Sequence, residues 1–237
     1  MVESYSKNAN HNMRRPVVKQ EIVDFMRNRQ MQVTGPLKEL EDFARKENIP
    51  IIRKGSQHLI RFMLELSRPL RILEIGTATG FSAIFMLSFL VKTARITTIE
   101  KMEARAVKAE ENFKKFDKNG QITLIKGDAS DILAELVAKG SKYDFIFMDA
   151  AKGQYINFFE NIKKLLSHGG IRVTDNMLQE GRLLDSRYTV VRRERTIHQR
   201  MREYVNVLAT DKELETMFLE TGDGMAVSVK KLIRMED

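Results

Sequence analysis

The segment LEIGTATGFSA, residues 73–83, has the composition of a ligand-binding turn between a strand and a helix. An apolar run ends at Glu74 and Ile75, a glycine turn follows, and a helical pattern opens near Gly80. Gly76 would let the backbone come close to a ligand, and the start of the helix offers free N–H groups to an anion. The spacing lacks the middle glycine of the dinucleotide fingerprint G-x-G-x-x-G, which makes a pyrophosphate ligand less favourable. The motif therefore favours a ligand other than a dinucleotide, or a tight turn with no ligand.

Two further acidic positions could hold an adenosine group. Glu100 follows the apolar run 95–99, and an acid at this place in a doubly wound sheet can accept both ribose hydroxyls. Asp128 and Ala129 follow the run 122–125, where an adenine ring could lie and Asp128 could accept from its amine. Each acid also has an ordinary structural interpretation, as a solvated side chain or as a helix N-cap. Glu100 fits any ligand that contains adenosine, so it does not identify one.

Polar side chains also follow two later strands of the predicted sheet. Asp149 ends the apolar run 145–148, and Asp175 with Asn176 ends the run 171–174. Two carboxylates and an amide at neighbouring strand ends form an all-oxygen set, which hard cations such as Mg²⁺ prefer. An acid at the end of a strand is common in any α/β protein, so a purely structural role is the alternative.

Composition and charge limit the classes of protein. The chain has 237 residues, 43% of them hydrophobic, and no cysteine, which excludes disulfides and thiolate metal sites. No apolar run is long enough to span a bilayer and the opening residues are polar, so we expect a cytoplasmic protein without a membrane partner. The formal net charge of +8 favours a polyanionic partner, although a solvated lysine-rich surface explains it equally well.

The hydrophobic pattern predicts an α/β fold. Short apolar runs alternate with helical stretches from residue 71 to residue 176, which is typical of a mostly parallel sheet with helices on both faces. The tripeptide Gly222-Asp223-Gly224 separates two late β-like runs and predicts a tight hairpin turn. The predicted helices cover residues 16–28, 37–46, 56–66, 80–91, 102–116, 132–138, 155–166 and 191–208, and the predicted strands cover 71–75, 95–99, 122–125, 144–148, 171–174, 214–220 and 225–233.

Together these motifs resemble the metal-dependent O-methyltransferases related to catechol and caffeoyl-CoA O-methyltransferases, from about Leu37 to Lys231. The resemblance implies one domain over residues 1–237, with an N-terminal helical extension (1–68) and a Rossmann-like core (69–237). That core is a doubly wound, mostly parallel seven-stranded sheet with a C-terminal antiparallel hairpin. It also implies S-adenosylmethionine as cofactor, bound by Ile52, Glu74, Gly76, Thr77, Ser82, Glu100, Asp128, Ala129 and Asp149. The implied ligands of Mg²⁺ or another divalent cation are Asp149, Asp175 and Asn176, and the implied catalytic residues are Lys152, as general base, and Asp149.

A narrower resemblance concerns the substrate. The segment ENIPII (residues 47–52), the stretch TDNMLQEG, the arginine-rich stretch after it and GDGMAVSVKK look like the bacterial tRNA 5-hydroxyuridine methyltransferases. These enzymes make 5-methoxyuridine at the wobble position, so the resemblance implies the tRNA anticodon loop as partner, and a homodimer. Gln179 and Glu180 depart from the apolar residue expected after the Asp-Asn pair. The arginines that could hold phosphates are Arg187, Arg192, Arg193 and Arg195, with Arg200 and Arg202 further along.

Other functions remain open at this stage. A catechol offers two adjacent oxygens just as 5-hydroxyuracil does, so a small-molecule O-methyltransferase would use the same residues. The alternation of Arg193, Glu194 and Arg195 also fits a solvated helix with intrahelical ion pairs. Four aromatic residues could stack on a base, namely Tyr155, Phe158, Phe159 and Tyr188, although a core position suits Phe158 and Phe159 better. A nucleoside- or RNA-binding module without catalysis and a nicotinamide oxidoreductase are weaker alternatives, because the first leaves Lys152 unexplained and the second lacks its fingerprint.

Overall fold

The computed structural model describes residues 20–178, 181–186 and 188–232. The chain divides into two compact units, Met1–Val33 and Thr34–Asp237. The first unit contributes one described helix, α1 (Gln20–Arg29), in which the Arg29 guanidinium lies 4.9 Å from the centre of the Phe25 ring.

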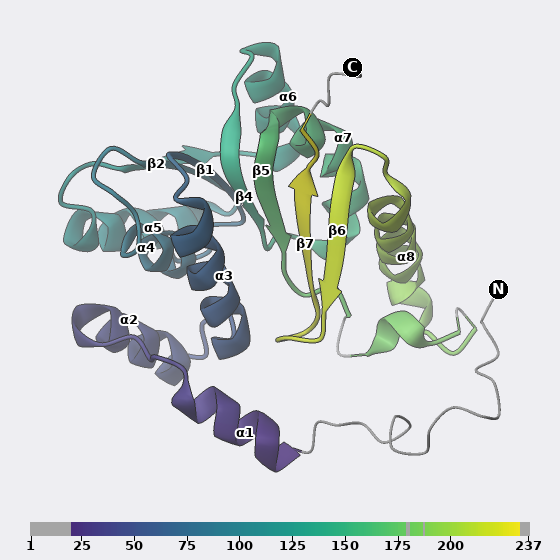
Figure 1. Cartoon of the computed structure of the whole chain (residues 1–237), viewed down its shortest axis with the longest axis horizontal. Coiled ribbons are helices and arrows are strands. Elements are labelled where there is room, and N and C mark those ends of the chain that lie inside the picture. Colours follow the sequence, from purple (N-terminus) through teal and green to yellow (C-terminus); the bar gives the residue numbers. More distant parts are fainter. Residues whose placement is uncertain (1–19, 179–180, 187, 233–237) are drawn as a thin grey trace. The chain divides into compact units, whose positions relative to one another are not determined.

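The second unit is built on one seven-stranded sheet in the order β3-β2-β1-β4-β5-β7-β6 (Figure 1). Neighbouring strands among the first five are parallel, whereas β7 is antiparallel to both β5 and β6. The order turns back between β1 and β4, the place where doubly wound sheets bind their ligands. The strands are β1 (Arg71–Ile75), β2 (Arg95–Glu100), β3 (Ile122–Lys126), β4 (Tyr143–Met148), β5 (Leu166–Thr174), β6 (Leu214–Leu219) and β7 (Met225–Lys230).

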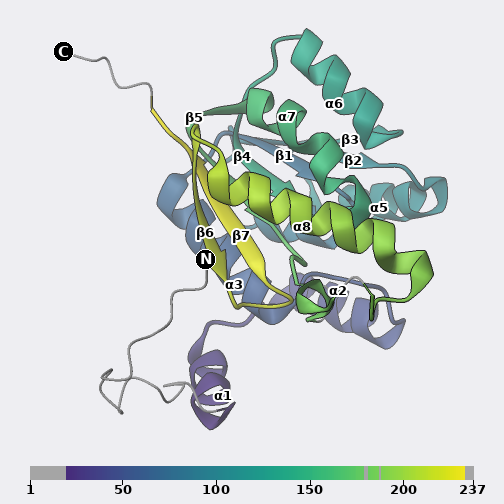
Figure 2. The ribbon, with the colours of Figure 1, turned by 90° about the vertical axis from the view of Figure 1, so that its right-hand side faces the viewer.

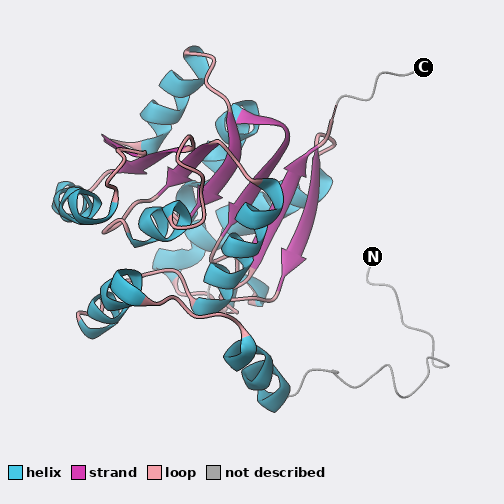
Figure 3. Ribbon diagram, turned by 60° about the vertical axis from the view of Figure 1, so that its left-hand side comes forward, coloured by secondary structure: helices cyan, strands magenta, loops and turns pink. Residues whose placement is uncertain are grey.

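Helices cover the sheet on both sides, so the strands lie between two helical layers (Figure 3). One layer contains α6, α7 and α8, which pack side by side (Figure 2). The other contains α3, α4 and α5, with α2 against α4. The helices are α2 (Gly35–Lys46), α3 (Lys54–Ser67), α4 (Phe81–Leu87), α5 (Glu103–Phe116), α6 (Ala129–Ala138), α7 (Tyr155–Leu165) and α8 (Arg195–Thr210).

Burial on both faces explains the apolar run at the end of β4. Ile146 and Met148 belong to the core that includes α7 and α8, while the alternate residues Phe145 and Phe147 are equally buried outside that cluster. Successive side chains of a strand point to opposite faces, so a strand with both faces covered favours apolar residues on both.

The predicted order of strands and helices is confirmed, with local differences at element ends. β5 begins at Leu166 rather than near residue 171, because Leu166 already pairs with Tyr143 of β4. The helix predicted over 80–91 ends at Leu87. The turn at Gly222-Asp223-Gly224 is a longer connection than predicted, since β6 ends at Leu219 and β7 begins at Met225. Among the described residues, no helix is both long enough and apolar enough to cross a membrane.

A buried carboxylate joins α2 to α3 and to the segment between them. Glu41 of α2 accepts hydrogen bonds from Lys54 Nζ at 2.7 Å, Arg45 Nη2 at 2.9 Å and Gln57 Nε2 at 2.9 Å. Gln57 Nε2 also donates to the carbonyl oxygen of Ile52 at 3.1 Å. Burial by itself would raise the pKa of Glu41, but the three donors lower it to about 2. The network therefore fixes the position of the segment that carries Ile52.

Candidate active site

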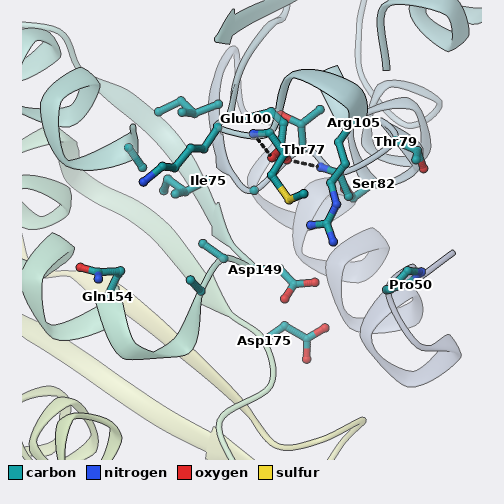
Figure 4. A pocket seen from close by; sticks show the side chains of 18 of the residues that line it. Pro50, Ile75, Thr77, Thr79, Ser82, Glu100, Arg105, Asp149, Gln154 and Asp175 are labelled. Atoms are coloured by element: carbon teal, nitrogen blue, oxygen red, sulfur yellow. Dashed lines mark hydrogen bonds between the residues drawn. The ribbon is translucent and has the colours of Figure 1, made fainter. Parts of the chain in front are cut away.

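A cavity of about 850 Å³ lies at the carboxyl ends of the parallel strands (Figure 4). Residues that follow β1, β2, β3, β4 and β5 all contribute to its wall, because the carboxyl ends of parallel strands meet at one edge of the sheet. Of the residues predicted from the sequence, the wall contains Ile52, Gly76, Thr77, Ser82, Glu100, Asp128, Ala129, Asp149, Asp175 and Asn176.

Gly76 brings the ends of β1 and β4 together. It has a φ of +99°, and a Cβ added there would lie 2.1 Å from the carbonyl oxygen of Asp149. The N–H groups of Gly76 and Thr77 both donate to the carbonyl oxygen of Ile99, at 3.1 Å each. The prediction that this glycine makes room for a ligand is therefore incomplete, since the space beside its Cα is filled by the backbone after β4. Gly76 contributes to the cavity wall through its backbone.

Glu74 lies behind the cavity wall. Its side chain is fully buried and accepts a hydrogen bond from Thr98 Oγ1, which in turn shares a hydrogen bond with Thr77 Oγ1. Its second oxygen, Oε1, has no hydrogen-bond partner in the described part of the chain. Burial raises the pKa of Glu74 to about 7. Thr77 and Ser82 contribute to the wall that Glu74 itself does not reach.

Glu100 shapes the wall next to α5. Its Oε2 accepts from the N–H of Ala78 and its Oε1 from the N–H of Met102, both at 2.8 Å (Figure 4). These bonds hold the glycine turn after β1 against the start of α5. Each carboxylate oxygen can accept more than one hydrogen bond, so Glu100 retains acceptor capacity toward the cavity.

Asp128 is the N-cap of α6. Its Oδ1 accepts from the N–H of Ser130 at 2.8 Å, and its Oδ2 pairs with Lys101 Nζ at 2.8 Å. The hydrogen bond from Lys101 lowers the pKa of Asp128 to about 2, with a further contribution from Ser130. The structural interpretation of this residue is thus confirmed, and Asp128 and Ala129 also contribute to the cavity wall.

The carboxylates of Asp149 and Asp175 both point into the cavity (Figure 4). Burial raises the pKa of Asp175 to about 6, with a further contribution from the charge of Asp149. Burial also raises the pKa of Asp149. Two carboxylates that lie close together away from solvent repel one another, and a bound cation would remove that repulsion.

Asn176 completes this group. Its backbone N–H donates to Asp175 Oδ1 at 2.8 Å, and its side-chain Nδ2 donates to Asp149 Oδ1 at 2.7 Å. Rotation of the side-chain amide by 180° would place its oxygen where Nδ2 now lies, because the nitrogen and oxygen ends of an amide have nearly the same shape. Among the described residues no three His, Asp or Glu side chains cluster together. The two carboxylates and this amide offer the oxygen donors that a hard cation takes.

Lys152 does not contribute to the wall of the large cavity. Its Nζ lies 3.3 Å from Asp223 Oδ2, and it contributes to a smaller pocket beside the large cavity. Asp223 belongs to the connection between β6 and β7 and is buried. This pairing could not be predicted from the sequence, because the two residues are 71 positions apart in the chain.

The arginines chosen from the sequence do not gather at the cavity. Arg187 lies outside the described residues. Arg192 and Arg193 are exposed, and Arg195 Nε donates to the carbonyl oxygen of Val190 at 3.1 Å. None of the three described arginines contributes to the wall of the cavity.

The aromatic residues considered for base stacking fall into two groups. Tyr155, Phe158 and Phe159 are buried between α7 and the sheet, so stacking by Tyr155 is excluded. Tyr188 is 89% exposed and stays available.

Sequence reasoning missed Arg105 and Gln154, which both contribute to the cavity wall (Figure 4). Arg105 lies in the first turn of α5, just after Glu100, and Gln154 lies just before α7. In the sequence, the two residues differ from others only in lying near the start of a helix at the ligand-binding edge of the sheet. Polar residues are common at such positions, so this feature does not identify a site.

The sequence is similar to those of known proteins. The sequence profile of the O-methyltransferase family matches residues 29–231. A catechol O-methyltransferase from Niastella koreensis is 31% identical over 175 residues, which cover 73% of this chain and 78% of that protein. A caffeoyl-CoA O-methyltransferase from Stellaria longipes is 28% identical over 70% of each chain.

The fold also matches a solved structure. An O-methyltransferase from Bacillus cereus, determined in complex with SAH, superposes with a TM-score of 0.76 at 24% identity, over 89% of this chain and 97% of that one. The family profile covers most of the sequence and the superposition covers most of the fold, so this chain belongs to the O-methyltransferase family.

Proposed function

We propose that this chain is an S-adenosylmethionine-dependent O-methyltransferase assisted by a divalent cation, and that its acceptor is 5-hydroxyuridine at the tRNA wobble position. One observation carries the proposal: a single cavity joins Glu100, with acceptor capacity for a ribose, to the paired carboxylates of Asp149 and Asp175. The demethylated cofactor bound by the Bacillus cereus relative supports the choice of methyl donor.

The cofactor would extend along the cavity wall. Glu100 would accept from the ribose hydroxyls, and Asp128 with Ala129 would contact the adenine ring. Ser82 and Thr77 line the part of the wall in front of Glu74, where the methionine end of the cofactor would lie.

Asp149, Asp175 and Asn176 would hold the cation, and Mg²⁺ suits their oxygen donors. The cation would act as a Lewis acid that makes the acceptor hydroxyl easier to deprotonate. Lys152, after losing a proton to solvent, would accept the hydroxyl proton at Nζ, and Asp223 Oδ2, 3.3 Å away, would stabilise the ammonium that forms. The acceptor oxygen would then attack the methyl carbon as the carbon–sulfur bond breaks, releasing S-adenosylhomocysteine. No covalent enzyme intermediate is needed, so the residues act mainly by positioning the two reactants.

The acceptor is inferred from chemistry and charge. In 5-hydroxyuracil the 5-hydroxyl lies beside the O4 carbonyl, so it offers the same pair of adjacent oxygens as a catechol. The formal net charge of +8 suits a polyanion such as tRNA. Assembly into a homodimer stays a prediction.

A small catechol is the second candidate acceptor, favoured by the name of the Niastella koreensis relative. It would use the same cavity and the same residues, with no need for the surrounding positive charge.

Parallel assays with two acceptors test the choice. The protein is incubated with S-adenosylmethionine and Mg²⁺, either with an anticodon stem-loop that carries 5-hydroxyuridine or with catechol, and products are measured by mass spectrometry. A stem-loop with uridine at that position is the control. Formation of 5-methoxyuridine supports the RNA acceptor. Methylation of catechol without methylation of the stem-loop would show that the acceptor is a small molecule.

A further inference from the structure

A second pocket, of about 540 Å³, lies against the loop between β4 and α7. It shares Ala151 and Gln154 with the large cavity, so the two spaces border the same loop. Its polar lining consists of Lys152, Gln154, Arg182, Glu194, His198 and Arg200.

His198 is the buried polar residue of this pocket. It lies in the first half of α8 and is only 3% exposed. Its Nε2 has no hydrogen-bond partner in the described part of the chain. A buried nitrogen without a partner costs free energy, so a hydrogen bond supplied from the pocket would stabilise this side chain.

The charges of the pocket do not cancel. Arg182 Nη1 pairs with Glu194 Oε2 at 2.8 Å, which neutralises the one carboxylate of the lining. Lys152 is paired with Asp223. Arg200 Nη1 donates to the carbonyl oxygen of Gly153 at 3.0 Å, and Arg200 forms no ion pair with any described residue. The positive charge of Arg200 and the imidazole nitrogen Nε2 of His198 therefore remain without a partner of opposite charge and without a hydrogen-bond partner, respectively, among the described residues.

We propose that this pocket binds a phosphate ester of the methyl acceptor, through the guanidinium of Arg200 and Nε2 of His198. A phosphodiester carries one negative charge and accepts hydrogen bonds from both groups, which matches what the pocket leaves unpaired. Arg200 is bonded to the residue after Lys152, so a phosphate held there lies next to the loop of the general base.

The inference rests on the proposed function and adds a specific role to it. The phosphate contact would fix the register of the acceptor, so that the hydroxyl to be methylated reaches the two aspartates. The same chemistry occurs in RNA and in an acyl-coenzyme A, and both sources are tested.

The test compares acceptors with and without a phosphate. One pair is the 5-hydroxyuridine stem-loop and the free nucleoside 5-hydroxyuridine; the other is caffeoyl-CoA and caffeic acid. Arg200→Gln is compared with Arg71→Gln, which removes the same charge from an exposed position at the start of β1, outside both pockets. Arg200→Gln should lower kcat/KM by about tenfold for the acceptor that carries a phosphate, with less than about a twofold change for the acceptor without one. Arg71→Gln should change kcat/KM by less than about twofold for either acceptor.

A binding measurement separates this inference from the proposed function. Imidazole ¹⁵N signals are followed while dimethyl phosphate is added, with His198→Gln used to assign the signal of His198. That signal should move in the wild type and in Arg71→Gln but not in Arg200→Gln, whichever acceptor is methylated. If Arg200→Gln loses activity with caffeoyl-CoA and the wild type does not methylate the stem-loop, the phosphate site is supported and the RNA acceptor is overturned. Equal effects of the two arginine variants, or a His198 signal that stays still, would overturn the phosphate site.

Discussion

Lys152 Nζ lies 3.3 Å from Asp223 Oδ2, and this contact ties the loop after β4 to the connection between β6 and β7. Asp223 is almost fully buried, whereas Lys152 is partly exposed. A buried carboxylate fixes the direction of the lysine side chain better than a solvated one would, because its own side chain is immobile. The ion pair therefore positions Lys152, the proposed general base, before the reaction.

Asp223→Asn should lower kcat by about tenfold, because Lys152 loses its anchor while the cofactor site is untouched. Binding of S-adenosylhomocysteine, measured by calorimetry, should change little. Asp211→Asn is the matched control, since Asp211 forms a similar pair with Lys163 at 3.0 Å in another part of the fold. If both variants keep the wild-type kcat per folded molecule, Asp223 does not position Lys152.

Gly76→Ala should destabilise the protein by about 3 kcal/mol, because the new Cβ would overlap the Asp149 carbonyl oxygen and the φ is positive. Gly120→Ala is the control, since Gly120 also has a positive φ but no atom within 4 Å of the added Cβ. It should cost only about 1 kcal/mol. Urea unfolding measures both, and equal losses would mean that the contact with Asp149 is unimportant.

Glu100→Gln should weaken S-adenosylhomocysteine binding by about tenfold to a hundredfold. An amide nitrogen would face one of the two backbone N–H groups that the carboxylate now accepts from, at Ala78 and Met102, and would distort the cavity wall. Glu103→Gln, an exposed change three residues away, should leave binding unchanged. Calorimetric titration decides between them, and unchanged affinity in Glu100→Gln would argue against its place in the cofactor site.

Glu41 should make the stability of the fold depend on acidity. Its pKa is about 2 in the folded protein and 4.5 without its partners, so its stabilising effect is complete above pH 4.5. That effect should be lost as the pH falls through 4.5 toward 2. Glu41→Gln should reduce the free energy of unfolding at pH 7 by about 1–2 kcal/mol, allowing for the exposure of its partners Arg45 and Lys54.

The control for Glu41 is Asp42→Asn, because Asp42 is an exposed neighbour paired only with Lys38. It should change the stability by less than about 0.5 kcal/mol. A Glu41→Gln protein with the same acid unfolding curve as the wild type would contradict the role of this network.

The fold and part of the site could be predicted because they depend on local patterns. Apolar runs locate the strands, and the residues just after them must meet at one edge of a parallel sheet, which is how Asp149 and Asp175 come to share a cavity. The contact of Lys152 with Asp223 could not be predicted, because it depends on how a distant connection folds back. The arginine-rich segment was recognised, but which arginine faces a pocket depends on the start of α8, and Arg200 rather than Arg193 does so.

The measurement that tests the central claim most directly is methyl transfer from labelled S-adenosylmethionine to tRNA from cells that lack 5-methoxyuridine. It is made with and without EDTA, and with the wild type and Asp175→Ala. The account predicts label at the wobble position that EDTA abolishes, that added Mg²⁺ restores, and that the variant never produces. Label that persists in EDTA and in Asp175→Ala would contradict a cation held by these carboxylates, and no label in the wild type would contradict the tRNA acceptor.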